Sequence, residues 1–251
     1  LIAELSEMVL EDPTKAFQSE RLRNVPTVNR SKKNSRNDVG DATITMVPSK
    51  MQQLLDLSRA HKNGHDEHVA SLAIMSLLAI FKDILPSYRI RQQTDRELQG
   101  KISKETKALW DFERALLTHY QQYLQVLEKA WEQDQGSKKD RKKKSVSSPS
   151  RLAITAMLSL CELLKSAYHF NFRSNIMNVV IRQMNNRHCD QVSQACCLAV
   201  EYVFEKDAQG EVAMETARRV AKLIKDYKGV LRPAVVQTFI KLPLRVHVDE
   251  A

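Results

Sequence analysis

Residues 66–86 read DEHVASLAIMSLLAIFKDILP, and this stretch decides the fold class. Its pattern predicts a helix that Asp66 caps and Pro86 ends. Apolar side chains surround most of that helix, so it must be buried between neighbours on two sides. The positions that we expect to be buried in this way are Val69, Leu72, Ala73, Met75, Ser76, Leu77, Ile80, Phe81 and Ile84.

Apolar residues at helical spacing continue on both sides of this segment. Before it, they predict helices over 1–11, which Asp12-Pro13 breaks, and over 49–60, which Ser49 caps. No segment shows the alternation of a strand. We predict an all-α protein, an irregular HEAT-like α-solenoid with one long helix and two basic flexible segments. Short connections join the last five predicted helices, over 151–168, 173–186, 190–205, 211–227 and 232–242.

The long helix is predicted over residues 101–135, which contain no Gly or Pro. Apolar pairs recur every seven residues along it and form a heptad-like face wider than the seam of a simple dimer. Such a face covers an adjacent helical stack of the same chain or pairs with a second protein. The residues that we expect to pack in this way are Leu109, Trp110, Leu116, Leu117, Tyr123, Leu124 and Trp131.

The positive charge of the chain is concentrated in two short strips. The 251 residues include 39 Lys and Arg against 30 Asp and Glu, a formal net charge of +9. Residues 21–36 hold six basic side chains and no acid, and residues 137–144 hold six and one. The rest of the chain therefore has 39 − 12 = 27 basic and 30 − 1 = 29 acidic residues, a balance of −2.

Clustered cations without matching acids favour contact with a nucleic-acid backbone. For residues 137–144, a nuclear import signal explains the charge as well as RNA contact does, and the two roles can coexist. A solvated loop is the further alternative. The corner that follows Pro86 adds a tyrosine and two arginines, which either anchor the turn or grip phosphates or an acidic partner. The candidate RNA or partner contacts are Arg30, Lys32, Lys33, Arg36, Tyr88, Arg89, Arg91, Lys138, Lys139, Arg141, Lys142, Lys143 and Lys144.

Motifs for catalysis are absent from the sequence: there is no P-loop, dinucleotide fingerprint, zinc-protease helix or nucleophile elbow. We therefore expect no enzyme activity, no catalytic residues, no metal and no cofactor. The spacing of His61, His65 and His68 suits a polar turn better than a metal site. The cysteines lack a C-x-x-C pair, so we expect buried free thiols and not a zinc site with His188. They are Cys161, Cys189, Cys196 and Cys197.

No signal peptide or membrane-spanning run is visible, and the chain starts inside a helical pattern, so we expect a fragment of a longer protein. The composition shifts predict four parts. They are an N-terminal helix with a basic arm (1–47), a helical repeat with the long helix (48–135), a basic linker (136–150) and a helical repeat region (151–251).

Four stretches resemble the third member of the nucleolar complex-associated protein family. They are FKDILPSYRIR (81–91), KISKETKALWDFERALLTHYQQYLQ (101–125), HFNFRSNIMNVVIRQMN (169–185) and GEVAMETARRVAKLIKDY (210–227), within a match over most of 49–242. The resemblance implies a non-catalytic helical scaffold factor of the nucleolus and nucleus that acts in early large (60S) ribosomal subunit assembly. It implies as partners a second nucleolar complex-associated protein in a heterodimer, pre-60S particle proteins and pre-ribosomal RNA.

Two other function classes stay open. The same family resemblance also implies a link to chromatin, as a replication licensing factor. A karyopherin-like transport adaptor is the third hypothesis, since those proteins are helical solenoids too. It ranks lower because importins are usually acidic, whereas the body of this chain is nearly neutral.

Overall fold

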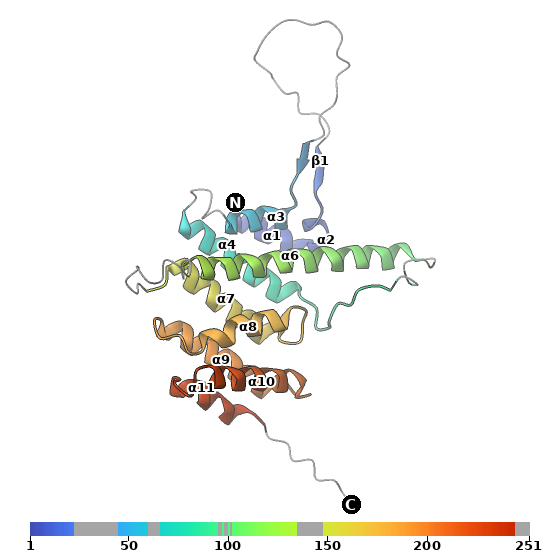
Figure 1. Cartoon of the computed structure of the whole chain (residues 1–251). Coiled ribbons are helices and arrows are strands. Elements are labelled where there is room, and N and C mark those ends of the chain that lie inside the picture. Colours follow the sequence, from blue (N-terminus) through green and yellow to red (C-terminus); the bar gives the residue numbers. More distant parts are fainter. Residues whose placement is uncertain are drawn as a thin grey trace, which may run out of the picture.

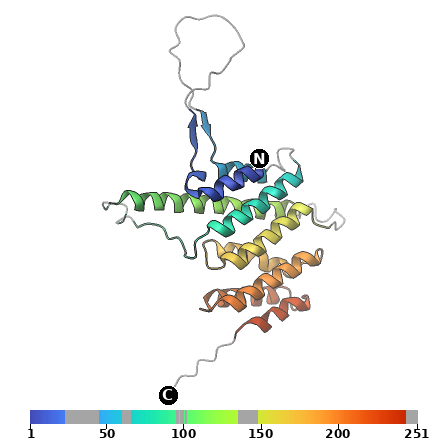
Figure 2. The ribbon, with the colours of Figure 1, turned by 180° about the vertical axis from the view of Figure 1, so that it is seen from behind.

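The structure is a computed structural model that describes residues 1–22, 45–59, 66–94, 97, 100, 102–134 and 148–243. Its helices stack one after another in two layers, as the two opposite views show (Figure 1 and Figure 2). The first layer contains α1 (Ile2–Glu11), α4 (Glu67–Ile84), α7 (Arg151–Ala167), α9 (Asp190–Lys206), α11 (Pro233–Gln237) and the 3-10 helix η3 (Thr238–Lys241). The second layer contains α3 (Lys50–Ser58), α6 (Lys104–Asp134), α8 (Arg173–Gln183) and α10 (Glu211–Asp226).

The all-α prediction is confirmed, and the helices pack on one continuous core that includes residues of both predicted repeat regions. Within the first layer α4 contacts α1 and α7, and α7 contacts α9. Across the layers α3 packs on α4, α6 on α7, and α8 on α7 and α9. This order of contacts is the one that a solenoid requires, and the repeat itself stays a prediction.

The expectation that no segment forms a strand was wrong for the two ends of the arm. A short helix, α2 (Pro13–Ala16), leads into β1 (Glu20–Leu22), which pairs antiparallel with β2 (Thr45–Val47). Arg21 lies opposite Met46 in this ribbon. Each strand finds its partner more than twenty positions along the chain, so neither shows a local pattern that predicts it.

The predicted helix ends are confirmed by their hydrogen bonds. The Ser49 hydroxyl accepts from the Gln52 backbone N–H at 3.2 Å, and the Asp66 carboxylate accepts from that of His68 at 3.1 Å. Both satisfy N–H groups that have no partner inside the helix. Helix α4 ends at Ile84, because Leu85 adopts the extended conformation that precedes a proline.

Four aromatic rings join α4, α6 and the turn between α7 and α8. Phe81 stacks on Tyr123 and lies against Tyr120, each with ring centroids 5.2 Å apart. Tyr120 in turn meets the edge of Phe170 at 5.6 Å. The Tyr123 hydroxyl donates to the Ile74 backbone carbonyl at 2.8 Å, so this cluster also fixes the position of α6 along α4.

The predicted burial of α4 was wrong at two positions. Leu72 and Met75 are each 57% exposed, because the stripe that they share points away from α1, α3 and α7. The other predicted positions are buried or half-buried, with Ala73, Leu77, Ile80 and Phe81 fully so. Helix α4 is therefore covered on every side but one in the part of the chain that the structure describes.

The two buried tyrosines of α6 offer a matched test of this packing. Tyr123→Phe removes the hydrogen bond to the Ile74 carbonyl and should lower the free energy of unfolding by about 1 kcal/mol. Tyr120→Phe should leave it unchanged or raise it, because no described residue pairs with the Tyr120 hydroxyl. Urea unfolding followed by circular dichroism measures both, and equal losses would contradict this assignment of contacts.

The partly buried ring of His119 should make the stability of the fold depend on pH. Its ring packs on Phe17 with centroids 5.0 Å apart, and burial lowers its pKa below the usual 6.5, although its bond to the Ala115 carbonyl acts the other way. The unfolded chain therefore binds the proton more tightly than the folded one. The contribution of the neutral ring is complete above pH 6.5 and is lost as the pH falls toward the lowered value.

We expect the urea midpoint of the wild-type chain to fall between pH 7.5 and pH 5.5 by more than that of His119→Phe, which keeps an apolar ring against Phe17. His188→Phe, at an exposed position, is the control and should follow the wild-type curve. Identical pH curves for His119→Phe and wild type would contradict the prediction.

Candidate binding site

The corner between α4 and α6 is held by one side chain from the turn before α8. Asn171 accepts from the Ile90 backbone N–H at 2.9 Å and donates to the Ile90 carbonyl at 2.8 Å. Asn171 thus supplies both bonds that a neighbouring strand would give to Ile90, which is buried. A ring nitrogen of His169 lies 3.3 Å from the Pro86 carbonyl. Two of the stretches that carry the sequence resemblance therefore contact each other directly.

The three predicted contact residues of this corner differ in what they touch. Tyr88 donates to the Glu113 carboxylate of α6 at 2.8 Å, and this bond raises the pKa of Tyr88. Arg91 binds both carboxylate oxygens of Glu97, at 2.6 and 3.0 Å, and lowers the pKa of Glu97 to about 2. Arg89 is exposed and has no ion-pair partner among the described residues.

The corner is therefore an anchoring device more than a cluster of available cations. Tyr88 and Arg91 each hold one part of the chain against another, so Arg89 is the side chain of the three whose charge faces solvent unengaged. One exposed guanidinium can contribute to binding a phosphate or a carboxylate, but it does not by itself make a site.

The heptad face of α6 is covered mainly by other helices of the same chain. Four of its predicted residues are buried in the common core: Leu116, Tyr123, Leu124 and Trp131. Leu117 and Trp110 are half-buried, and Leu109 is 50% exposed. The first half of α6 thus keeps some apolar surface toward solvent, whereas its second half covers α3, α4 and α7.

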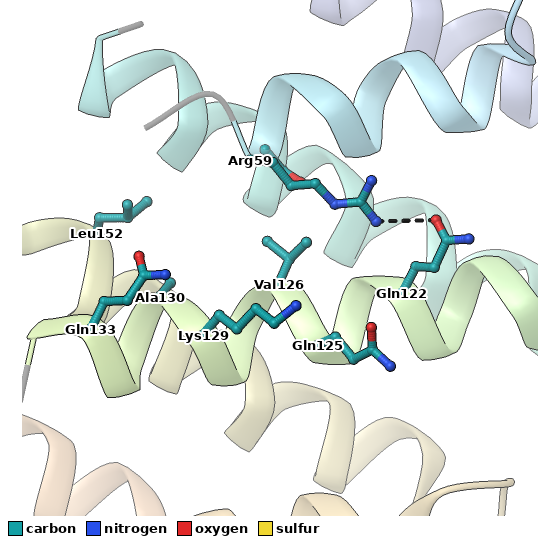
Figure 3. Close-up of a pocket in the computed structure, with 9 residues that line it drawn as sticks. Arg59, Gln122, Gln125, Val126, Lys129, Ala130, Gln133 and Leu152 are labelled. Carbon is teal, nitrogen blue, oxygen red and sulfur yellow. Dashed lines mark hydrogen bonds between the residues drawn. The ribbon is translucent and has the colours of Figure 1, made fainter. Parts of the chain in front are cut away.

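A groove of about 170 Å³ lies between the C-terminal ends of α3 and α6 (Figure 3). Arg59 spans it and donates to Gln122 at 3.1 Å, while Lys129, Gln125 and Gln133 line the α6 side. None of the lining residues is an Asp, Glu, His or Cys, so the groove offers hydrogen bonds and positive charge.

Metal-ligating groups do not converge in the described ranges, and two cysteines that meet there are buried. No three His, Cys, Asp or Glu side chains there are placed to hold a metal, and His61 and His65 lie outside the described residues. The sulfur atoms of Cys161 and Cys196 lie 3.6 Å apart in the core as free thiols. The contact with Cys161, together with burial, raises the pKa of Cys196, which keeps it protonated and unreactive.

The predicted contact residues of the two basic strips lie outside the described residues: Arg30, Lys32, Lys33, Arg36, Lys138, Lys139, Arg141, Lys142, Lys143 and Lys144. The structure describes the chain on either side of them. The β1–β2 ribbon brings residues 22 and 45 together, and the Ser150 N–H bonds to Asp134 at 3.1 Å. Each basic segment therefore leaves and re-enters the helical body at one place.

An apolar outward row was missed by the sequence reasoning. Besides Leu72 and Met75 of α4, the first layer exposes Leu198 and Tyr202 on α9, by 50% and 36%. The four-residue spacing of Leu198 and Tyr202 is a helical one, but a buried face has the same spacing, so apolar spacing alone cannot separate the two. None of the described helices is long and apolar enough to cross a membrane.

Comparison with known proteins places these features in a family. A family model described as "Nucleolar complex-associated protein" matches residues 1–123. A Mus musculus protein named nucleolar complex protein 3 homolog is 34% identical over 251 residues, which is 95% of this chain and 30% of the relative. The chain belongs to the nucleolar complex protein 3 family.

Other members of the nucleolar complex protein 3 family agree. The Homo sapiens nucleolar complex protein 3 homolog is 36% identical over 70% of the chain and 22% of its own length. The Arabidopsis thaliana nucleolar complex-associated protein 3 is 31% identical over 84% of the chain and 24% of its own length. The chain spans less than a third of the length of these relatives.

The Asn171 clamp gives a prediction for this family member. Asn171→Ala removes both bonds to the buried Ile90 backbone and should lower the free energy of unfolding by about 2 kcal/mol. Asn175→Ala, at an exposed position of α8, should change it by less than about 0.5 kcal/mol. Urea unfolding compares the two, and a loss at Asn171 no larger than that at Asn175 would show that the corner does not depend on the clamp.

Proposed function

We propose that this chain is a non-enzymatic nucleolar scaffold in early large (60S) ribosomal subunit assembly, which binds partner assembly factors and pre-ribosomal RNA. The observation that carries the proposal is the exposed apolar pair Leu72 and Met75 on α4, with a second exposed pair, Leu198 and Tyr202, on α9 of the same layer. Leu72 and Met75 lie one turn apart on α4, and adjacent exposed apolar side chains of this kind are typical of protein docking surfaces. The printed names of the relatives speak of a nucleolar complex, which agrees with such a surface.

Partner binding would use the first layer of the stack. A second nucleolar complex-associated protein is the partner that we propose for it, as one half of a heterodimer, with pre-60S proteins around the pair. Methionine, leucine and tyrosine are suited to this role, since flexible or amphipathic apolar side chains dominate interface cores. The exposed Leu109 at the start of α6 offers a smaller second contact.

RNA binding would use the basic arm and loop, whose charge lies in 21–36 and 137–144. Both segments leave the body at fixed points, so they would extend its reach to nearby phosphates without changing the helices. The loop also suits nuclear import, and the two roles are compatible. Crosslinking in cells tests this part: adducts mainly with ribosomal RNA precursors support the proposal, and adducts mainly with origin DNA would favour the licensing role instead.

A double substitution tests the docking row. Leu72→Gln with Met75→Gln should leave stability within about 0.5 kcal/mol of wild type, because both side chains are already exposed. It should reduce copurification of other nucleolar complex proteins with the full-length protein at least tenfold, as expected for loss of an interface anchor. Met214→Gln with Tyr227→Gln is the matched control, since Met214 is exposed on α10 and Tyr227 is exposed directly after it.

The control should retain the copurified partners at the wild-type level. Equal recovery with both double variants would show that the α4 row is not a docking surface, and the scaffold role would then need another interface.

A further inference from the structure

The outer surface of the second layer carries a row of cations on α8 and α10. These two helices run side by side in the same direction, as their paired contacts show. Arg173 near the start of α8 binds Glu211 at 2.6 Å and Glu215 at 3.4 Å, near the start of α10. Two turns further, Arg219 contacts both Glu215, at 2.7 Å, and Asn178. Charges are thus balanced along the first half of the helix pair.

The second half of the pair is different. Arg182 on α8 and Arg218, Lys222 and Lys225 on α10 are all exposed, and none forms an ion pair with a described residue. Asp226 is the one acidic residue that follows them on α10. We call these four side chains the cationic row.

The helix register places the row on one surface. Arg182 follows Asn178 by one turn and Lys222 follows Arg219 by about one turn, so the two cations lie just beyond the contact that joins the helices. Arg218, Lys222 and Lys225 are four and three residues apart and share one face of α10 over roughly 10 Å. Both helices end at this side of the stack.

Stabilisation of the helix ends explains only part of the row. Cations in the last turn interact favourably with the helix dipole, which accounts for Arg182 and Lys225. Arg218 and Lys222 lie earlier in α10, beyond the reach of that effect. Neither forms an ion pair with a described residue, so their charge faces solvent and can meet a ligand of opposite charge.

We infer that the cationic row binds the phosphate backbone of RNA, an inference that rests on the proposed function because it requires that the chain meets RNA. Several separate cations on one surface are what backbone binding needs, since each neutralised phosphate releases counterions. An acidic protein fits less well: exposed charge pairs contribute little to protein binding, and no aromatic anchor lies among the four. The row binds backbone without reading bases, because it has no stacking side chain.

The test measures binding of the whole 251-residue chain to a fluorescent oligouridine across a series of salt concentrations. The row variant replaces Arg182, Arg218, Lys222 and Lys225 by Gln. It should reduce the steepness of the slope of log affinity against log salt by up to about 3, since each single-strand phosphate contact contributes about 0.7 to that slope. The control variant replaces by Gln four other exposed cations that form no ion pair with a described residue: Lys104, Lys107, Arg151 and Lys206.

The control variant has the same formal charge change and should flatten the slope by much less. A row variant with the slope of the control, or of wild type, would overturn the inference. Arg218→Gln with Lys222→Gln, which leaves the helix ends intact, should give about half the flattening of the full row variant and decides the matter if that variant does not fold.

Two further arms separate the possible failures. Neutralising the six cations of 137–144 reports on the loop alone: if it flattens the slope and the row variant does not, the proposed function stands and the inference fails. Absence of oligouridine binding by the wild-type chain would remove RNA binding from the proposed function as well. Binding of a fluorescent oligoglutamate as tight as that of oligouridine, and lost with the row, would assign the row to an acidic protein and overturn the inference.

Discussion

The ring of Phe81 is the contact on which the arrangement of the helices depends. It lies against Tyr120 and Tyr123, so the end of α4 is fixed to the middle of α6, and Phe170 extends the same cluster to the start of the next helix pair. The chain between α4 and α6 must then turn a corner within a short distance of this cluster. Asn171 holds that corner by its Ile90 bonds, so packing and backbone pairing act together at one point.

Features of the fold that depend on adjacent residues could be predicted from the sequence. Features that depend on which helices or strands pack together could not. Ser49, Asp66 and Pro86 act on the backbone next to them, so the helix ends were predictable. The exposure of Leu72 depends on which helices pack around α4, and the β1–β2 ribbon depends on a distant partner. Neither can be obtained from apolar spacing alone.

The candidate contact residues were predicted from clusters of charge along the sequence. Counting charge in this way does not reveal cations that only the fold brings together, such as those of α8 and α10. Helices α8 and α10 together hold six basic and three acidic residues, a net charge of +3 that the nearly neutral total of the body conceals. In the structure the acids and the remaining bases lie apart: Glu211 and Glu215 form ion pairs at one end, whereas Lys222 and Lys225 at the other form none with a described residue. The two layers consequently differ in character: the first exposes an apolar row and the second a cationic one. Under the proposed function, protein and RNA would meet opposite faces of one rigid stack.

The β1–β2 ribbon, which stands away from the stack in Figure 1, has a consequence for how the family can vary. Because residues 22 and 45 are paired, the chain between them starts and ends at one point and transmits no change of its length to the helices. The entropy of closing such a loop rises by only about 0.6 kcal/mol for each doubling of its length. Insertions and deletions in this arm are therefore nearly neutral for stability, so its length is free to diverge between species while the corner and its clamp stay in register.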